Sequence, residues 1–571
     1  MNIRFPQTIP FPTFLLLCKA DESSGLSRQQ QIEKFIEEAE EAGELQNLDE
    51  ASLKQSLINL EKKINKNQIL RMKFSSEPEK FMDSELDLNS EINDLFALAA
   101  SPELYKVLVD AGSVDSVLGM VAHENTDISL SAIGLLQELT EPDSFVQCPD
   151  AICLVDGFLA SQGLELIVQN LTRLDEKNEE DATGVYNTIS IIENLVAVKP
   201  TTANMLCTKT HFLTFLLERL AWKVFDSNKL FCSEILCILL QADMTNTALL
   251  SDKRSLQGEM DGVDALLQIL FQYRKKEDLL SDEEECIHNL FHALCVALRL
   301  PATQGRFHDL QGMELMVKCL KEMKYAAMCA IRAVNYSLTE NKRNAMKFLL
   351  IGGLKYIFPM LLGKGLPKPH IKGKKKALSF EQKQEMEEDV ISIICQMSLL
   401  LYNTTEQDCC TRLLGKFIEN DYEKIEHCAE LFVKYSKQLE ATDYQLESVQ
   451  IAALRAQMEE IGKVDEEDEE DKEEADIYRH ARRLEGGLQS LQQLSIIILF
   501  AGVYGGQEIF ERVNNKLKLD GYSLHNVLLI LRETAARLTT PDDTIVSSGF
   551  DRHRNLIVEW CATLAGIEKK L

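Results

Sequence analysis

The sequence contains few of the residues that make turns and few aromatic residues. Of its 571 residues, 27 are glycine and 13 are proline, and aromatic residues make up 7%. A β-barrel or β-sandwich needs many turns, so this composition favours helices over strands. A chain of this length is also too long for one compact core, which indicates several domains or an extended array of repeats.

Positive charge is also scarce. The chain has 61 lysine and arginine residues against 90 aspartate and glutamate residues, a net charge of −29. Binding to nucleic acid depends on basic residues that replace phosphate counterions, so we expect no direct binding to nucleic acid. An acidic protein is suited to hold basic segments of other proteins. The same charge can serve solubility alone, and composition does not decide between the two.

Paired-cysteine motifs and the common catalytic motifs are absent. The fifteen cysteines include no CxxC pair and mostly lie in helical patterns, so we interpret them as buried free thiols in a reducing compartment. No P-loop, GxGxxG or GxSxG motif is present. His288 and His292 share a predicted helix face but lack an HExxH arrangement, and the Cys409–Cys410 pair has no neighbour that would activate it. The sequence therefore predicts no enzyme activity, no bound metal and no cofactor.

Long hydrophobic runs are missing as well. The longest internal run, Ile496 to Tyr504, is too short to span a membrane. The apolar patch from Phe14 to Cys18 is similar to a weak signal peptide, but three nearby prolines interrupt this region. We expect a soluble intracellular protein without membrane contact, in which residues 1–47 form a disordered or atypical N-terminus. Secretion is the alternative.

A repeat is present instead. A glycine recurs before a short amphipathic stretch at Gly112, Gly163, Gly262, Gly312, Gly353 and Gly487. The same position, occupied by Ser113, Gly163, His211, Gly262 and Gly312, returns every 48 to 51 residues, which is typical of stacked repeats. We predict that the glycine is a corner between two helices, because a helix C-terminus commonly ends in the left-handed conformation that glycine adopts easily.

A longer helical pattern follows each short one, giving three helices per repeat. Examples are "DISLSAIGLLQELT", "VYNTISIIENLVAV" and "AAMCAIRAVNYSL". This pattern predicts an all-α, armadillo-type right-handed superhelical solenoid with an N-terminal helical cap and a C-terminal helical region. The predicted N-terminal cap covers residues 48–100, and in it Asp49 caps a helix from about Ala51 to Lys63. The predicted repeats cover residues 101–405 and include a Lys-rich loop at about 364–380. The predicted C-terminal region covers residues 406–571 and is interrupted by an acidic linker at 464–474.

The third helices would line the groove of such a stack. Helical periodicity places four candidate peptide-binding residues on their exposed face: Glu138, Asn187, Asn194 and Asn335. In importin adaptors this groove carries a ladder of tryptophans, each four residues before an asparagine. This chain has only Trp222 and Trp560, so we do not expect an import adaptor. The candidates are suited to extended or basic peptides, and the alternative is that they are merely solvated.

Several long segments resemble the beta-catenin-like protein 1 family. They include "LDEASLK" (Leu48–Lys54), "KNQILRMKF" (Lys66–Phe74) and "EKFMDSELDLN" (Glu79–Asn89). The resemblance implies a nuclear, spliceosome-associated armadillo scaffold of the nineteen complex, which recognises basic, import-signal-like segments of splicing factors. It also implies a C-terminal region involved in self-association, and hence a possible homodimer.

One departure from the family affects localisation. Family members carry a basic nuclear-import signal near the N-terminus, whereas Met1 to Asn47 has no basic cluster. Import would then rely on the lysines of residues 372–376 or on a bound partner. The competing function is a cytoplasmic armadillo adaptor in transport or signalling.

Overall fold

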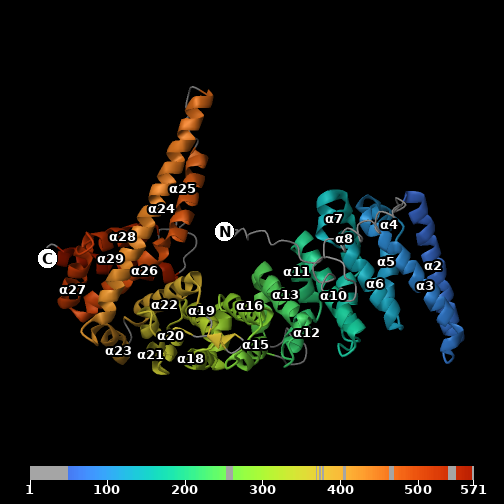
Figure 1. Cartoon of the computed structure of the whole chain (residues 1–571), viewed down its shortest axis with the longest axis horizontal. Coiled ribbons are helices and arrows are strands. Elements are labelled where there is room, and N and C mark those ends of the chain that lie inside the picture. The colour runs from blue at the N-terminus through green and yellow to red at the C-terminus, as the bar shows by residue number, and fades with distance from the viewer. Residues whose placement is uncertain are drawn as a thin grey trace, which may run out of the picture. The chain divides into compact units, whose positions relative to one another are not determined.

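The chain is built almost entirely of helices in a computed structural model (Figure 1). The structure describes residues 49–252, 261–367, 370–371, 374–375, 378–402, 407–461, 469–537 and 548–568. The predicted N-terminal segment 1–47 and the first half of the predicted acidic linker lie outside these residues. Within them, the strands are β1 (His370–Ile371) and β2 (Lys374–Lys375), an antiparallel pair in the predicted Lys-rich loop.

The chain divides into two compact units. The first comprises residues 1–117 and 143–157, and the second comprises residues 118–142 and 158–571. In the first unit, α2 (Glu50–Lys73) packs on α3 (Met82–Asp94). The Asp49 side chain accepts a hydrogen bond from the Ser52 backbone N–H at 2.7 Å, which confirms the predicted N-cap. The helix continues beyond Lys63, its predicted end, because Ile64 and Asn67 extend its buried face.

The other short elements of this part of the chain lie between α2 and α3 or after α3. They are η2 (Pro78–Lys80), η3 (Leu95–Ala100), η4 (Pro102–Leu104), α7 (Pro142–Gln147) and η5 (Pro149–Ile152).

Helices then occur in successive groups of three, as the repeat predicts. The first helices are α4 (Tyr105–Asp110), α8 (Cys153–Ala160), α11 (Thr202–Lys209), α14 (Met244–Ser251), α17 (Pro301–Asp309) and α20 (Lys342–Leu350). The second helices are α5 (Ser113–Val121), α9 (Gly163–Leu171), α12 (Phe212–Leu220), α15 (Gly262–Tyr273), α18 (Gly312–Glu322) and α21 (Leu354–Leu361). The third helices are α6 (Thr126–Leu139), α10 (Glu179–Val198), α13 (Ser227–Ala242), α16 (Ser281–Ala297), α19 (Tyr325–Leu338) and α22 (Phe380–Leu401). These groups confirm the all-α, armadillo-type fold.

Polar caps start several of the third helices. Asn125, Asn178 and Asp226 each accept a backbone N–H in the first turn of α6, α10 and α13. Ser379 and Gln382 form a reciprocal capping box that ends the Lys-rich loop at the start of α22. Local sequence therefore fixes where these third helices begin.

The predicted left-handed glycine is found at Gly112 and Gly487, but the prediction is wrong at the other four positions, Gly163, Gly262, Gly312 and Gly353. At Gly163 and Gly312 the left-handed residue is the preceding glutamine, with φ of 57° at Gln162 and 60° at Gln311. The glycine instead begins the second helix, beneath a phenylalanine ring from the first. A Cβ at position 163 would lie 2.5 Å from the Phe158 ring. The absence of a side chain, more than a left-handed backbone, is what this position requires.

The remaining corners differ among themselves. Gly112 has φ of +69° and fits the prediction. At Gly353 the left-handed residue is again the preceding one, Gly352, and a Cβ would collide with Phe348. Gly262 begins α15 after the N-cap Asp261. Gly487 is left-handed but lies in the π-turn η6 (Leu484–Leu488), outside any three-helix repeat.

The C-terminal region is helical throughout its described part. It contains α23 (Gln407–Ile418), α24 (Glu423–Ile461), α25 (Glu469–Arg483), α26 (Gln489–Gly505), α27 (Gln507–Lys518), α28 (Leu524–Arg537) and α29 (Ser548–Glu568). Helices α24 and α25 run side by side (Figure 1). Helix α25 begins inside the predicted acidic linker, since glutamate and lysine are good helix formers.

Candidate functional site

The third helices form a continuous layer in the second unit. Helix α10 packs against α6 and α13, and the series continues through α16, α19 and α22 to α26. Each helix buries its apolar residues on one side, as Ile189, Ile192 and Leu195 do on α10. Polar side chains of successive helices therefore meet on the opposite side of the layer.

Carboxylates on three successive third helices form an acidic row on this layer. We define the row as Glu193 on α10, Glu234 on α13 and Glu285 on α16. Glu193 and Glu234 are half-buried, and Glu285 is exposed. Among the described residues, no lysine or arginine forms a salt bridge with any of the three. The row is a line of carboxyl groups that no cationic side chain of the described residues pairs with.

The environment of Glu193 and Glu234 opposes the ionisation of these two carboxyl groups. Burial, followed by the charges of Glu285 and Glu193, raises the pKa of Glu234 to about 7. Burial and the charge of Glu141 also raise the pKa of Glu193. A cation placed along the row would relieve this repulsion and favour the ionised carboxylates.

An exposed tyrosine stands beside the row. Tyr186 on α10 is 44% exposed, and its ring lies 5.0 Å from the Phe231 ring on α13. Its pKa is raised by burial and by the charges of Glu193, Glu234 and Glu141. A tyrosine face surrounded by carboxylates is a favourable place for an ammonium or guanidinium group.

The four groove residues predicted from the sequence all lie on third helices. Glu138 on α6 is exposed, and Asn187 on α10 is half-buried. Asn194 is only 7% exposed, and its Nδ2 has no hydrogen-bond partner among the described residues. Asn194 directly follows Glu193, so an unused donor lies next to the acidic row.

Asn335 on α19 belongs to a different group of residues. Its Nδ2 donates to Asp389 at 2.9 Å, and its Oδ1 accepts from Ser392 at 2.8 Å and from Gln396 at 2.6 Å. Gln493 on α26 also donates to Ser392 at 3.2 Å. Asn335 thus links α19, α22 and α26, and its amide is already engaged within the fold.

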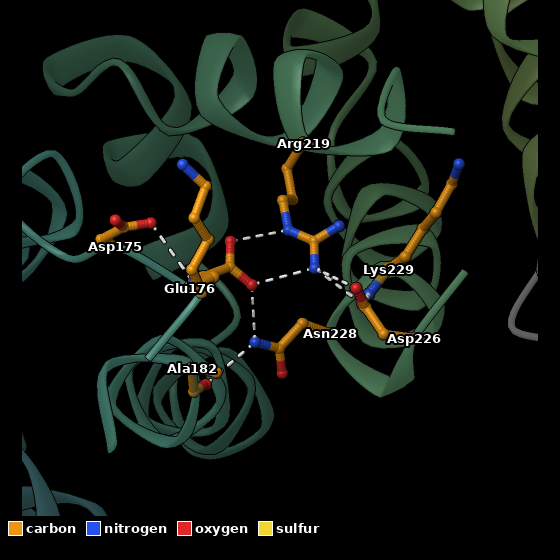
Figure 2. A network of polar contacts seen from close by, with 8 residues as sticks. Asp175, Glu176, Ala182, Arg219, Asp226, Asn228 and Lys229 are labelled. Atoms are coloured by element: carbon orange, nitrogen blue, oxygen red, sulfur yellow. Dashed lines mark hydrogen bonds and ion pairs between the residues drawn. The ribbon is translucent and has the colours of Figure 1, made fainter. Parts of the chain in front are cut away.

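A second polar cluster is buried between repeats (Figure 2). Arg219 on α12 donates two hydrogen bonds to Glu176, at 2.6 and 2.9 Å, and two to Asp226, at 2.7 and 2.8 Å. Asn228 donates to the same glutamate and to the Ala182 carbonyl, each at 2.9 Å. The Arg219 and Glu176 side chains are only 2% and 7% exposed. This cluster holds α12, α13 and the segment before α10 together, and its Arg219–Glu176 pair is shielded from solvent.

His288 with His292 and Cys409 with Cys410 are the two side-chain pairs that the sequence raises for metal binding or thiol chemistry. The rings of His288 and His292 lie 6.2 Å apart, and no group of three or more potential ligands gathers anywhere in the described parts of the chain. Cys409 is 2% exposed, and burial raises the pKa of Cys410, which lowers the fraction of reactive thiolate. No disulfide joins the described cysteines, and most of them are buried.

Among the described residues, one helical stretch, Ala475–Gly505, is long and apolar enough to cross a membrane. However, 78% of its apolar window is buried inside the fold, as in a core helix of a folded protein.

Sequence reasoning missed the acidic row. Glu193, Glu234 and Glu285 are 41 and 51 residues apart along the chain. They become neighbours only when the rotation of each helix about its axis is known. Their shared position on consecutive third helices, aligned by the buried residues, was the available signal.

Comparisons with known proteins show which family this chain belongs to. A family model described as "Catenin-beta-like, Arm-motif containing nuclear" matches residues 30–532. Beta-catenin-like protein 1 of Homo sapiens is 37% identical over 498 residues, which cover 86% of this chain and 82% of the human protein. The beta-catenin-like protein 1 homolog of Schizosaccharomyces pombe is 30% identical over 426 residues, covering 74% of this chain and 70% of the homolog. Among solved structures, an engineered protein aligns with a TM-score of 0.42 and 13% identity, covering 87% of this chain and 98% of that protein. The resemblance seen in the sequence is thus confirmed, and the chain belongs to the catenin-beta-like family of nuclear, Arm-motif-containing proteins.

Proposed function

We propose that the acidic row holds an extended, basic segment of a partner protein, and that the chain acts as a non-catalytic scaffold. The observation that carries this proposal is the row of Glu193, Glu234 and Glu285, three carboxylates without a cationic partner among the described residues, on consecutive helices. Tyr186 adds an aromatic face, and the unpaired Asn194 amide adds a hydrogen-bond donor for a backbone carbonyl. Nucleic acid is disfavoured because its phosphates would meet these carboxylates.

The spacing of the helices sets the spacing of the basic residues. Packed helices lie about 8–10 Å apart, and an extended chain advances about 3.3 Å per residue. A basic side chain roughly every three residues would therefore meet one carboxylate of the row. Charge complementarity of this kind contributes more to specificity and association rate than to affinity.

We further propose that the partner proteins are splicing factors in the nucleus. The support is the membership of a family described as nuclear, together with the sequence resemblance to a spliceosome-associated family. The alternative is a cytoplasmic adaptor with the same groove chemistry. Fractionation of cells that express the tagged chain separates the two, since the splicing role requires a nuclear pool.

The peptide-binding step can be tested with a matched pair of triple variants. The row variant replaces Glu193, Glu234 and Glu285 with glutamine. The control replaces Glu79, Glu103 and Glu180, which are exposed carboxylates outside the row, with glutamine. Fluorescence anisotropy with a labelled lysine-rich peptide should show at least about a tenfold loss of affinity for the row variant and little change for the control. If both variants lost the same affinity for the peptide, the loss would come from the change in net charge alone, and the proposal would be contradicted.

The same variants test the splicing role. Tagged wild-type protein and the control variant should recover splicing factors from nuclear extract, and the row variant should not. Recovery of none by the wild-type protein would exclude the splicing assignment but leave the peptide-binding result intact.

A further inference from the structure

A pocket opens on the layer of third helices where the acidic row ends. It has a volume of about 170 Å³ and is lined by residues of α16, α19 and α22. Glu285, the last member of the row, lies one helical turn before His288, which lines the pocket. The row and the pocket are therefore continuous along α16.

The pocket has an apolar floor. Phe291 and Cys295 of α16 and Met386 of α22 are each less than 5% exposed. Tyr325 and Met328 of α19 are half-buried and form its wall. An apolar cavity of about 150 Å³ is large enough to take up a benzene molecule, so this one can take a single large side chain.

The rim of the pocket carries no free positive charge. Arg332 pairs with Glu385 at 2.9 Å and with Asp389 at 3.6 Å, so two carboxylates face one guanidinium. Burial and the charge of Arg332 lower the pKa of His288, and burial and His288 lower that of His292, which favours neutral rings. The rim therefore disfavours an acidic side chain in the pocket. The apolar floor favours an apolar one.

We infer that the bound segment carries an apolar anchor, a leucine-, methionine- or phenylalanine-sized side chain that enters this pocket next to its basic residues. This inference rests on the proposed function and narrows the class of partner segment. The argument for the occupant is charge complementarity along the row together with the continuity of row and pocket on α16. Since the pocket is centred about one helix beyond Glu285, the anchor lies roughly three residues from the nearest basic side chain.

The inference can be tested with a pair of labelled peptides. Both are lysine-rich, and one carries a single leucine about three residues from the lysine cluster, where the other carries alanine. Each is made with the cluster before and after that position, so that either chain direction is covered. One of the two leucine peptides should bind wild-type protein more tightly than the other. That peptide should bind about tenfold more tightly than the alanine peptide with the same order of residues.

A variant that fills the pocket provides the second half of the test. Met328→Trp places a larger side chain in the pocket wall, and Met82→Trp makes the same change at an exposed residue of the first unit. Met328→Trp should bring the ratio of leucine-peptide affinity to alanine-peptide affinity down to about one, while Met82→Trp should keep the roughly tenfold preference. If Met328→Trp does not fold by circular dichroism, Cys329→Leu replaces it, since Cys329 also lines the pocket.

The outcomes separate this inference from the proposed function. Equal binding of leucine and alanine peptides, with lysines still required, overturns the anchor and leaves the basic-segment site standing. A Met328→Trp effect that is the same for both peptides also overturns the anchor. Failure of every lysine-rich peptide to bind wild-type protein overturns both.

Discussion

The ring of Phe307, near the end of α17, occupies the space that a side chain at position 312 would need at the start of α18. The phenylalanine is fully buried. Three atoms of its ring, including the one nearest the backbone, would collide with a Cβ placed at Gly312. Phe158 with Gly163 and Phe348 with Gly353 repeat the arrangement at the same five-residue spacing. This contact fixes the angle between the first and second helices of a repeat.

Replacement of Gly312 by alanine should therefore destabilise the second unit. The added methyl group must displace a buried ring, and overpacking of this kind costs about 1–3 kcal/mol. Gly305→Ala is the control, because Gly305 lies inside α17 and no neighbouring side chain comes within 4 Å of where its new methyl group would lie. That control should be neutral or stabilising by up to about 1 kcal/mol. Urea unfolding followed by circular dichroism measures both, and equal midpoints would show that Phe307 moves aside freely.

The buried cluster of Figure 2 gives a second stability prediction. Arg219→Met removes the guanidinium and leaves the Glu176 carboxylate buried without its main partner. Loss of one member of a buried ion pair costs about 3–5 kcal/mol. Arg343→Ala, which breaks an exposed pair with Asp309, should cost less than about 1 kcal/mol. Thermal unfolding of the two variants compares the costs, and a mild effect of Arg219→Met would mean that water replaces the lost contacts.

Much of the fold could be predicted from the sequence because the third helices carry strong periodic patterns. The stretch "VYNTISIIENLVAV" buries Ile189, Ile192 and Leu195 on one face, and such a face needs a neighbouring helix. The glycine positions are also visible in the sequence, but their cause is not. The contact between Phe307 and Gly312 depends on how the chain turns between two helices, which helical periodicity does not describe.

The candidate site is harder to predict for a related reason. Asn194 and Glu193 are adjacent in the sequence, yet analogy with grooves that use asparagine points only to Asn194. Glu234 lies in a largely apolar helix and has no sequence neighbour that marks it. Its significance comes from Glu193 and Glu285 on the two flanking helices, and such contacts between distant residues follow only from the packed structure.

Glu234 should make the stability of the protein depend on pH. Its pKa rises from 4.5 to about 7 on folding, so the folded state holds this proton more tightly than the unfolded state. The stabilisation is present at low pH and is lost as the pH rises through 7. Glu234→Gln removes the ionisation, so its stability relative to wild type should increase between pH 4.5 and about 7 and level off above that. Urea unfolding across this range measures the difference, with Glu103→Gln as the exposed control.

Binding of a lysine-rich peptide should show the opposite dependence on pH. The peptide pairs with ionised carboxylates, so it lowers the pKa of Glu234 and displaces the proton that the free protein holds near neutral pH. Affinity should therefore weaken as the pH falls below 7, by at most about tenfold per pH unit if one proton is released. Protonation of His288 and His292 would also weaken binding at low pH, so the Glu234→Gln variant is needed to separate the two causes.

Titration calorimetry in buffers of different ionisation enthalpy counts the protons released. Wild-type protein should release a proton that the Glu234→Gln variant does not, and equal release by both would assign the pH dependence to groups other than Glu234.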